Sequence, residues 1–126
     1  MAAAVSFEIL GNHPSDVRKG VERTVEKLDG RLGGGLLFLC GTLARQPLDV
    51  AVAVRELGLA APILLATGAG VLTERGEHEQ VSACAGLFWQ AGTCTPFAVD
   101  KRGDEPLSDR LPKPSSKWRG RDNILW

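Results

Sequence analysis

Two short, wholly apolar runs constrain the fold of this chain more than any other feature. Leu36–Cys40 is one run and Ile63–Ala66 is the other, and each is followed closely by glycine, Gly41 and Gly68. A half-exposed strand alternates apolar and polar residues, so a run without alternation is typical of a strand that is buried on both faces. We therefore expect two interior strands that lie side by side.

The segment between the two runs predicts a helix. Pro47 fits the first helical turn, where its missing N–H has no partner to lose. The helix is expected from Leu48 to Leu57, with Gly58 as its stop. A strand, a helix and a strand joined by short links predict parallel pairing with a right-handed crossover.

The residues before the first run predict one more strand and one more helix. Val5 to Leu10 is expected as a strand that ends in a turn over residues 11–14. Ser15 is expected at the N-cap, and Gly30 at the C-terminal end of the helix. Apolar residues that recur every three or four positions define the buried helix face: Val17, Val21, Val25 and Leu28.

The second half of the sequence predicts further strands, followed by a segment without periodic apolar residues. Residues 73–80 are interpreted as a polar connecting loop, Val81 to Trp89 as a third buried strand, and Thr93 to Val99 as an edge strand containing Pro96. The fold class expected is α/β, with a mostly parallel or mixed sheet of four to five strands and two flanking helices. Residues 1–100 form this domain, and residues 101–126 are expected to be a disordered or loosely held tail rich in proline and basic residues.

Composition and motifs exclude several classes of function. The formal net charge is zero, so a uniformly basic nucleic-acid binder is not indicated. The three cysteines form no Cys-x-x-Cys pair, and no Gly-x-Ser-x-Gly elbow occurs, so no zinc, redox or nucleophile motif is present. The N-terminus resembles no secretory leader and no apolar run nears the ~20 residues that span a bilayer, so we expect a cytoplasmic protein that is not a complete enzyme.

The glycines that close the two apolar runs mark the candidate ligand site. Open α/β sheets bind ligands at the carboxyl ends of their strands. The expected ligand-binding residues are Cys40, Gly41, Thr67, Gly68 and Gly70, acting mainly through main-chain hydrogen bonds. The turn at residues 67–70 lacks the known phosphate-binding glycine patterns. Its alternative interpretation is a tight turn that needs positive φ.

Two other functions remain open at this stage. The chain is alternatively a small enzyme that uses Glu77, His78 and Glu79, with Glu74 nearby, as an acid–base or metal site. The same residues would also fit a solvated loop. A sheet of four or five strands also leaves an unpaired edge, so the chain is alternatively an interaction fragment that completes its sheet by forming a homo-oligomer or by pairing with another chain.

Four segments resemble the FIST N domain, a sensory module of prokaryotic signal-transduction proteins, across residues 16–100. They are the run Leu36–Cys40, the helix start Pro47-Leu48-Asp49, the strand and glycine turn Pro62–Val71, and Glu77 and Glu79 ahead of Val81-Ser82-Ala83. The resemblance implies the sensing of small, amino-acid-like ligands, haem binding in some members, and a signalling output protein as partner. The family's domain is longer and has a second half, so a truncated or divergent member is expected.

Overall fold

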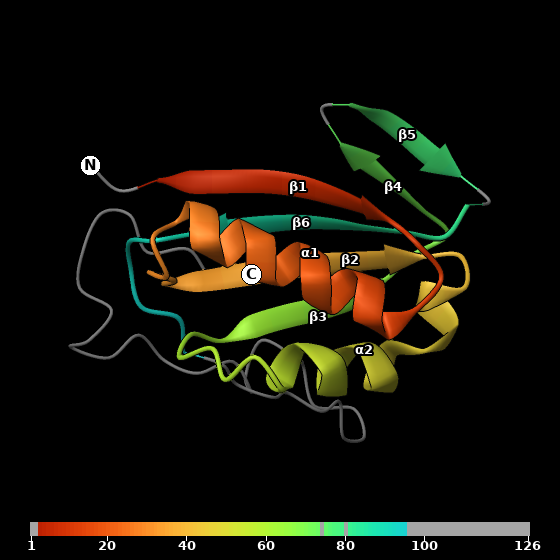
Figure 1. Cartoon of the computed structure of the whole chain (residues 1–126). Coiled ribbons are helices and arrows are strands. Elements are labelled where there is room, and N and C mark those ends of the chain that lie inside the picture. The colour runs from red at the N-terminus through yellow and green to blue at the C-terminus, as the bar shows by residue number, and fades with distance from the viewer. Residues whose placement is uncertain (1–2, 74, 80, 96–126) are drawn as a thin grey trace, which may run out of the picture. The chain divides into compact units, whose positions relative to one another are not determined.

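The computed structural model describes residues 3–73, 75–79 and 81–95 of the chain. The elements alternate as the sequence predicts, with one additional hairpin (Figure 1). In chain order they are β1 (Ala4–Leu10), α1 (Pro14–Lys27), β2 (Gly34–Cys40), the 3₁₀ turn η1 (Leu43–Arg45), α2 (Pro47–Arg55), β3 (Ile63–Thr67), β4 (Gly70–Thr73), β5 (Gly76–Glu79) and β6 (Ala83–Trp89).

The main sheet is mixed and has four strands in the order β1-β6-β2-β3. β2 and β3 run parallel, with Leu39 beside Thr67, which confirms that the two apolar runs are neighbours. β6 runs antiparallel to both β1 and β2 and fills the position between them. The predicted α/β class and mixed sheet are therefore confirmed.

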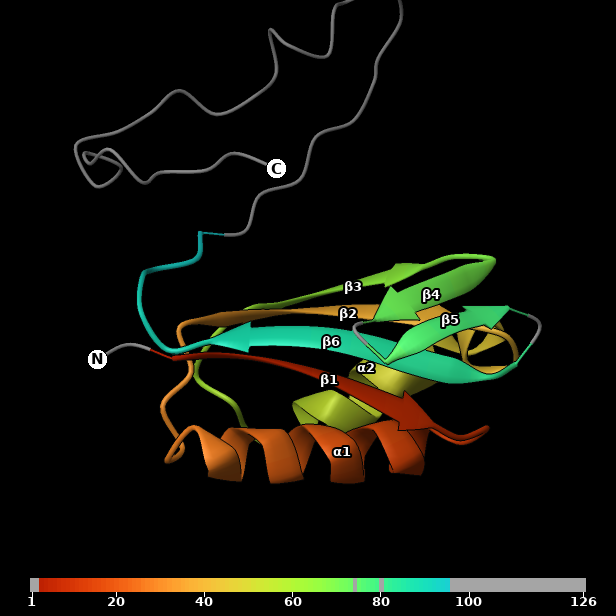
Figure 2. The same cartoon turned by 90° about the horizontal axis from the view of Figure 1, so that it is seen from above.

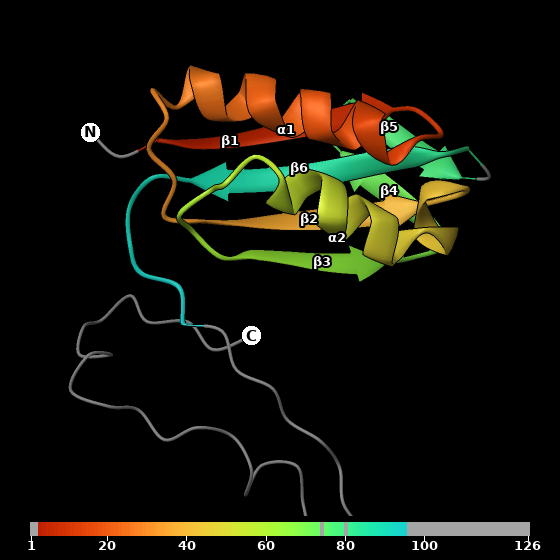
Figure 3. The ribbon, with the colours of Figure 1, turned by 60° about the horizontal axis from the view of Figure 1, so that its bottom comes forward.

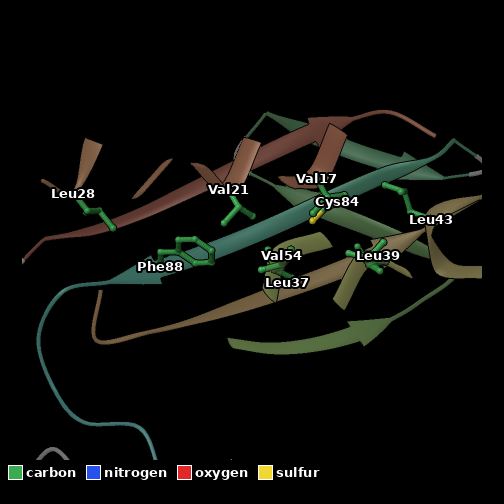
Figure 4. Packing of buried hydrophobic residues seen from close by; sticks show 10 residues of the cluster. Val17, Val21, Leu28, Leu37, Leu39, Leu43, Val54, Cys84 and Phe88 are labelled. Carbon is green, nitrogen blue, oxygen red and sulfur yellow. The ribbon is translucent and has the colours of Figure 1, made fainter. Parts of the chain in front are cut away.

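Both helices pack on one face of the main sheet, and the small β4–β5 hairpin lies at the other face (Figures 1 and 2). The core lies between the sheet and the helices, where Val17, Val21 and Phe88 are fully buried (Figure 4). Phe88 meets Phe7 edge to face, with ring centroids 4.9 Å apart. The two rings lie over glycines of the neighbouring strands, since Phe7 is opposite Gly86 and Phe88 is opposite Gly35.

The prediction that the apolar runs are buried on both faces is wrong. In β2 Leu37 and Leu39 are buried beneath the helices and Cys40 is buried on the other face, but Phe38 is 44% exposed. In β3 Leu64 is 60% exposed. The physical reason is that both helices cover the same face. We call the side that carries no helix, which includes Leu36, Phe38, Leu64 and Leu87, the open face of the sheet.

The predicted N-cap of the first helix is also wrong. The cap position is His13, and Pro14 rather than Ser15 begins the helix. Pro14 fits there because the first helical residue has no intrahelical N–H partner. The Asp16 carboxylate accepts a hydrogen bond of 3.2 Å from the main-chain N–H of His13, which gives that helix end a side-chain partner.

The predicted helix ends agree with the structure to within a few residues. Gly30 follows α1 with φ of 71°, and its N–H donates to the Val25 carbonyl over 3.0 Å. α2 ends at Arg55, before the predicted Leu57, and Gly58 follows with φ of 64°. Both glycines occupy the left-handed conformation that commonly closes a helix.

The interpretation of residues 73–80 as a loop is wrong, because this stretch contributes to the antiparallel hairpin of β4 and β5. Residues 93–95 of the expected edge strand have no strand structure, and the rest of that strand and the tail lie outside the described residues. Among the described residues, no helix combines the length and apolarity needed to cross a membrane.

Replacing Phe88 with alanine is expected to destabilise the fold by about 3–5 kcal/mol, because a large, fully buried ring leaves a cavity. Urea denaturation followed by circular dichroism measures the change. Leu87→Ala is the matched control, because this neighbour is 40% exposed on the open face and is expected to cost less than about 1 kcal/mol. An equal decrease in unfolding free energy in the two variants would contradict a core that lies only on the helix side of β6.

Candidate functional site

A small hollow lies on the open face at the carboxyl ends of β2 and β3. It has a volume of about 210 Å³ and is lined by Phe38, Thr67, Gly68, Gly70, Val71, Leu72 and Ala85. Three of the five sequence-predicted site residues, Thr67, Gly68 and Gly70, are among them. The main sheet provides Phe38 and Ala85, and the hairpin strand β4 provides Val71 and Leu72.

The glycine turn forms because β3 ends beside β2 and the chain then passes to β4. The Gly68 N–H donates to the Leu39 carbonyl over 2.8 Å, which holds the start of the turn to β2. Neither Gly68 nor Gly70 has positive φ, so the interpretation as a turn that needs such a conformation is wrong. Gly70 is required for a different reason: a Cβ there would lie 2.9 Å from the main-chain oxygen of His78 on β5.

The other two predicted site residues, Cys40 and Gly41, do not line the hollow. Cys40 is fully buried under the hairpin, and its thiol donates to the Val81 carbonyl over 3.3 Å. It packs with Val71, Ala83 and Ala85 in a small apolar cluster. Gly41 has φ of 63° and approaches the main chain of residues 81–82, which leaves no room for a side chain. Cys40 therefore packs against the hairpin, while Gly41 lies against the segment that leads into β6.

The walls of the hollow are mostly apolar, and its polar groups belong to the main chain. Phe38, Val71, Leu72 and Ala85 provide the hydrocarbon surface. Alternation along β3 places the Thr67 side chain on the helix face with Ile63 and Leu65, so Thr67 contributes its backbone to the hollow. Such a site suits a small molecule with an apolar body and a polar end.

A second group of side chains, which the sequence analysis missed, ties the hairpin to β1. One carboxylate oxygen of Glu8 lies 3.0 Å from Nε2 of His78 and accepts a hydrogen bond of 2.8 Å from the Thr73 hydroxyl. The Glu8 and His78 side chains are only 13% and 22% exposed. In the sequence, Glu8 alternates with Phe7 and Ile9 as a solvent-facing strand residue does. The partners of Glu8 become evident only in the folded structure, where the hairpin packs over β1.

This environment favours the charged form of Glu8. The hydrogen bond from Thr73, followed by that from His78, lowers the pKa of the Glu8 carboxyl below its ordinary value of 4.5. Burial acts in the opposite direction, and the nearby positive charges of His78 and Arg75 lower the pKa further. Glu8 is therefore a charged anchor for the hairpin at neutral pH.

The sequence cluster Glu77, His78 and Glu79 does not converge on one point. Glu77 and Glu79 are exposed on one side of β5, while His78 faces Glu8 on the other side. The alternation of side chains along a strand requires this separation. Within the part of the chain that the structure describes, no three His, Cys, Asp or Glu side chains are grouped to hold a metal ion.

Replacing Glu8 with glutamine is expected to reduce stability at pH 7 and to matter less in acid. A carboxyl whose pKa is lowered by folding contributes stability above its unfolded pKa, and the contribution is lost as the pH falls through the folded pKa. The difference in unfolding free energy between wild type and Glu8→Gln should therefore shrink as the pH falls below about 4.5. Urea denaturation at several pH values measures it. Glu22→Gln, at an exposed position of α1, is the control. A difference that is the same at every pH would contradict the anchoring role.

No protein-family model, no curated protein and no solved structure matches this chain.

Proposed function

We propose that this chain is a small-ligand-sensing domain of a cytoplasmic signal-transduction protein, and that its ligand binds in the hollow at the ends of β2 and β3. The observation that carries the proposal is that the glycine turn singled out in the sequence borders an apolar hollow. The resemblance to the FIST N domain supports the same conclusion, because its segments include this strand and turn.

The size and walls of the hollow favour an amino-acid-like ligand. Drug-sized ligands occupy pockets of about 300–1,000 Å³, and this hollow of about 210 Å³ suits a smaller molecule. An apolar side group would pack on Phe38, while a charged or polar end would bond to the main chain near Gly68. Haem fits less well, because the lining contains no His, Cys, Met or Tyr to serve as its axial ligand.

The hairpin is the element through which binding would be signalled to an output protein. A ligand changes the state of a protein only if it contacts one conformation more favourably than another. Val71 and Leu72 place β4 against the ligand, and Thr73 and His78 connect the same hairpin to Glu8 on β1. Ligand binding in the hollow would therefore change the stability of the packing between the hairpin and the sheet.

Isothermal titration of the whole chain with a panel of free amino acids tests this proposal, with haem added separately and followed by its absorbance. We expect one amino-acid-like ligand to bind at one site. Phe38→Ala should weaken binding by on the order of tenfold or more, because it removes the largest apolar wall. Folded wild-type protein that binds no member of the panel would count against the proposal.

Leu87→Ala is the matched control for this experiment. Leu87 and Phe38 lie on the same open face and have similar exposure, 40% and 44%, but Leu87 is not part of the lining. Its removal should leave the affinity unchanged. Equal weakening in both variants would place the ligand on the open face at large and not in the hollow.

A further inference from the structure

The edge of the sheet at β3 has the properties of a pairing surface. β3 is the last strand in the order β1-β6-β2-β3, and no described strand pairs with its outer side (Figure 3). Its sequence, Ile-Leu-Leu-Ala-Thr, contains neither a charge nor a proline. Native sheets usually protect such edges with charged residues, prolines or bulges. By contrast, the other edge strand, β1, carries Glu8.

Two hydrogen bonds identify the main-chain groups that face outward. The Gly35 N–H donates to the Pro62 carbonyl over 3.2 Å at the start of β3, and the Gly68 N–H donates to Leu39 over 2.8 Å at its end. In a parallel ladder, alternate residues of a strand bond to the same neighbour. Residues 62, 64, 66 and 68 therefore bond inward to β2. Ile63, Leu65 and Thr67 present their N–H and C=O groups outward.

A second observation lies beside this edge, on the helix face. An apolar hollow of about 230 Å³ is lined by residues of both α2 and β3. Its lining is apolar except for Arg55, and consists of Leu37, Ala51, Val54, Arg55, Leu59, Ala61, Ile63 and Leu65. Side chains therefore do not completely fill the space between α2 and the sheet at the edge strand β3.

We propose that β3 pairs antiparallel with β3 of a second copy of this chain, across a two-fold axis at Leu65. The outward residues are symmetric about Leu65, so Ile63 of each copy faces Thr67 of the other and Leu65 faces Leu65. Each of these pairs exchanges both main-chain hydrogen bonds. The second copy's Leu65 lies on the helix face, beside the apolar hollow, and adds hydrocarbon there.

A second copy is the occupant that this geometry favours. The pairing is self-complementary, as an isologous two-fold interface requires. The strand carries no charge to repel its own copy. The hollow is lined in part by Ile63 and Leu65, and in this register the second copy brings Thr67 beside Ile63 and Leu65 beside Leu65. The hairpin strand β4 makes its main contacts with the sheet to β6, β2 and β1.

Sedimentation of the full chain over a range of concentrations tests the pairing, and a dimer is expected. Thr67→Pro should weaken the dimer by on the order of tenfold or more, because it removes an outward N–H from the pair with Ile63 at both ends of the interface. The variant should still fold, since proline is tolerated on an edge strand where its nitrogen faces outward. Leu87→Ala, on the open face, should leave the dimer unchanged. A wild-type monomer at all concentrations, or a dimer that Thr67→Pro leaves intact, would overturn the proposal.

Cysteine cross-linking tests the register. In the proposed pairing Leu64 lies directly opposite Ala66 of the other copy, at a Cα separation of about 4.5 Å that a disulfide bridges. Leu64 and its own symmetry mate lie farther apart than about 7 Å, which is too far. In a Cys94→Ser background, an oxidised mixture of Leu64→Cys and Ala66→Cys chains should therefore give a cross-linked dimer, and neither variant alone should do so. Cross-linking of Leu64→Cys alone would indicate contact through the open face and overturn the edge pairing.

Discussion

The insertion of β6 between β1 and β2 is the interaction on which the rest of the structure depends. β6 pairs through seven residues with β1 and through seven with β2, so it joins the first strand to the β2-α2-β3 unit. The same strand carries Phe88 and Cys84 into the core beneath the helices, and Ala85 into the floor of the hollow on the opposite face. Without β6, the two halves of the sheet would share no main-chain hydrogen bonds.

Coverage of only one sheet face by helices explains the position of the candidate ligand hollow. The apolar residues of β2 and β3 that point away from the helices need other cover. The hairpin covers those at the carboxyl end, where Cys40, Val71, Ala83 and Ala85 are buried together. Phe38, Leu64 and Leu87 remain partly exposed. The candidate ligand hollow is located at the boundary between the covered and the exposed part.

The hairpin is held by groups of two kinds. Apolar contacts around Cys40 attach one side of it, and the hydrogen-bonded group of Glu8, Thr73 and His78 attaches the other. Apolar contacts are insensitive to pH, whereas the Glu8 contacts depend on its charge. Because the hairpin also forms a wall of the hollow, the stability of the Glu8 group and the shape of the hollow are linked. The β3 edge adjoins the hollow at Thr67, which belongs both to the lining and to the outward edge of the strand.

The sequence by itself determined the order of the main-sheet strands and the helices, the parallel pairing of the two apolar runs and the glycine turn that borders the hollow, but not the β4–β5 hairpin. Each of these follows from local signals: Pro47 at a helix start, Gly30 and Gly58 at helix ends, and uninterrupted apolar runs of strand length. Tertiary structure alone decided which face each run buries, because an apolar run has no alternation to distinguish its two sides. It also decided the roles of Glu8 and Cys40. The partners of Glu8 lie 65 and 70 positions away, and Cys40 lies under a hairpin whose short strands resemble a polar loop in sequence. Contacts over such separations depend on how the chain packs, and no local pattern of residues encodes them.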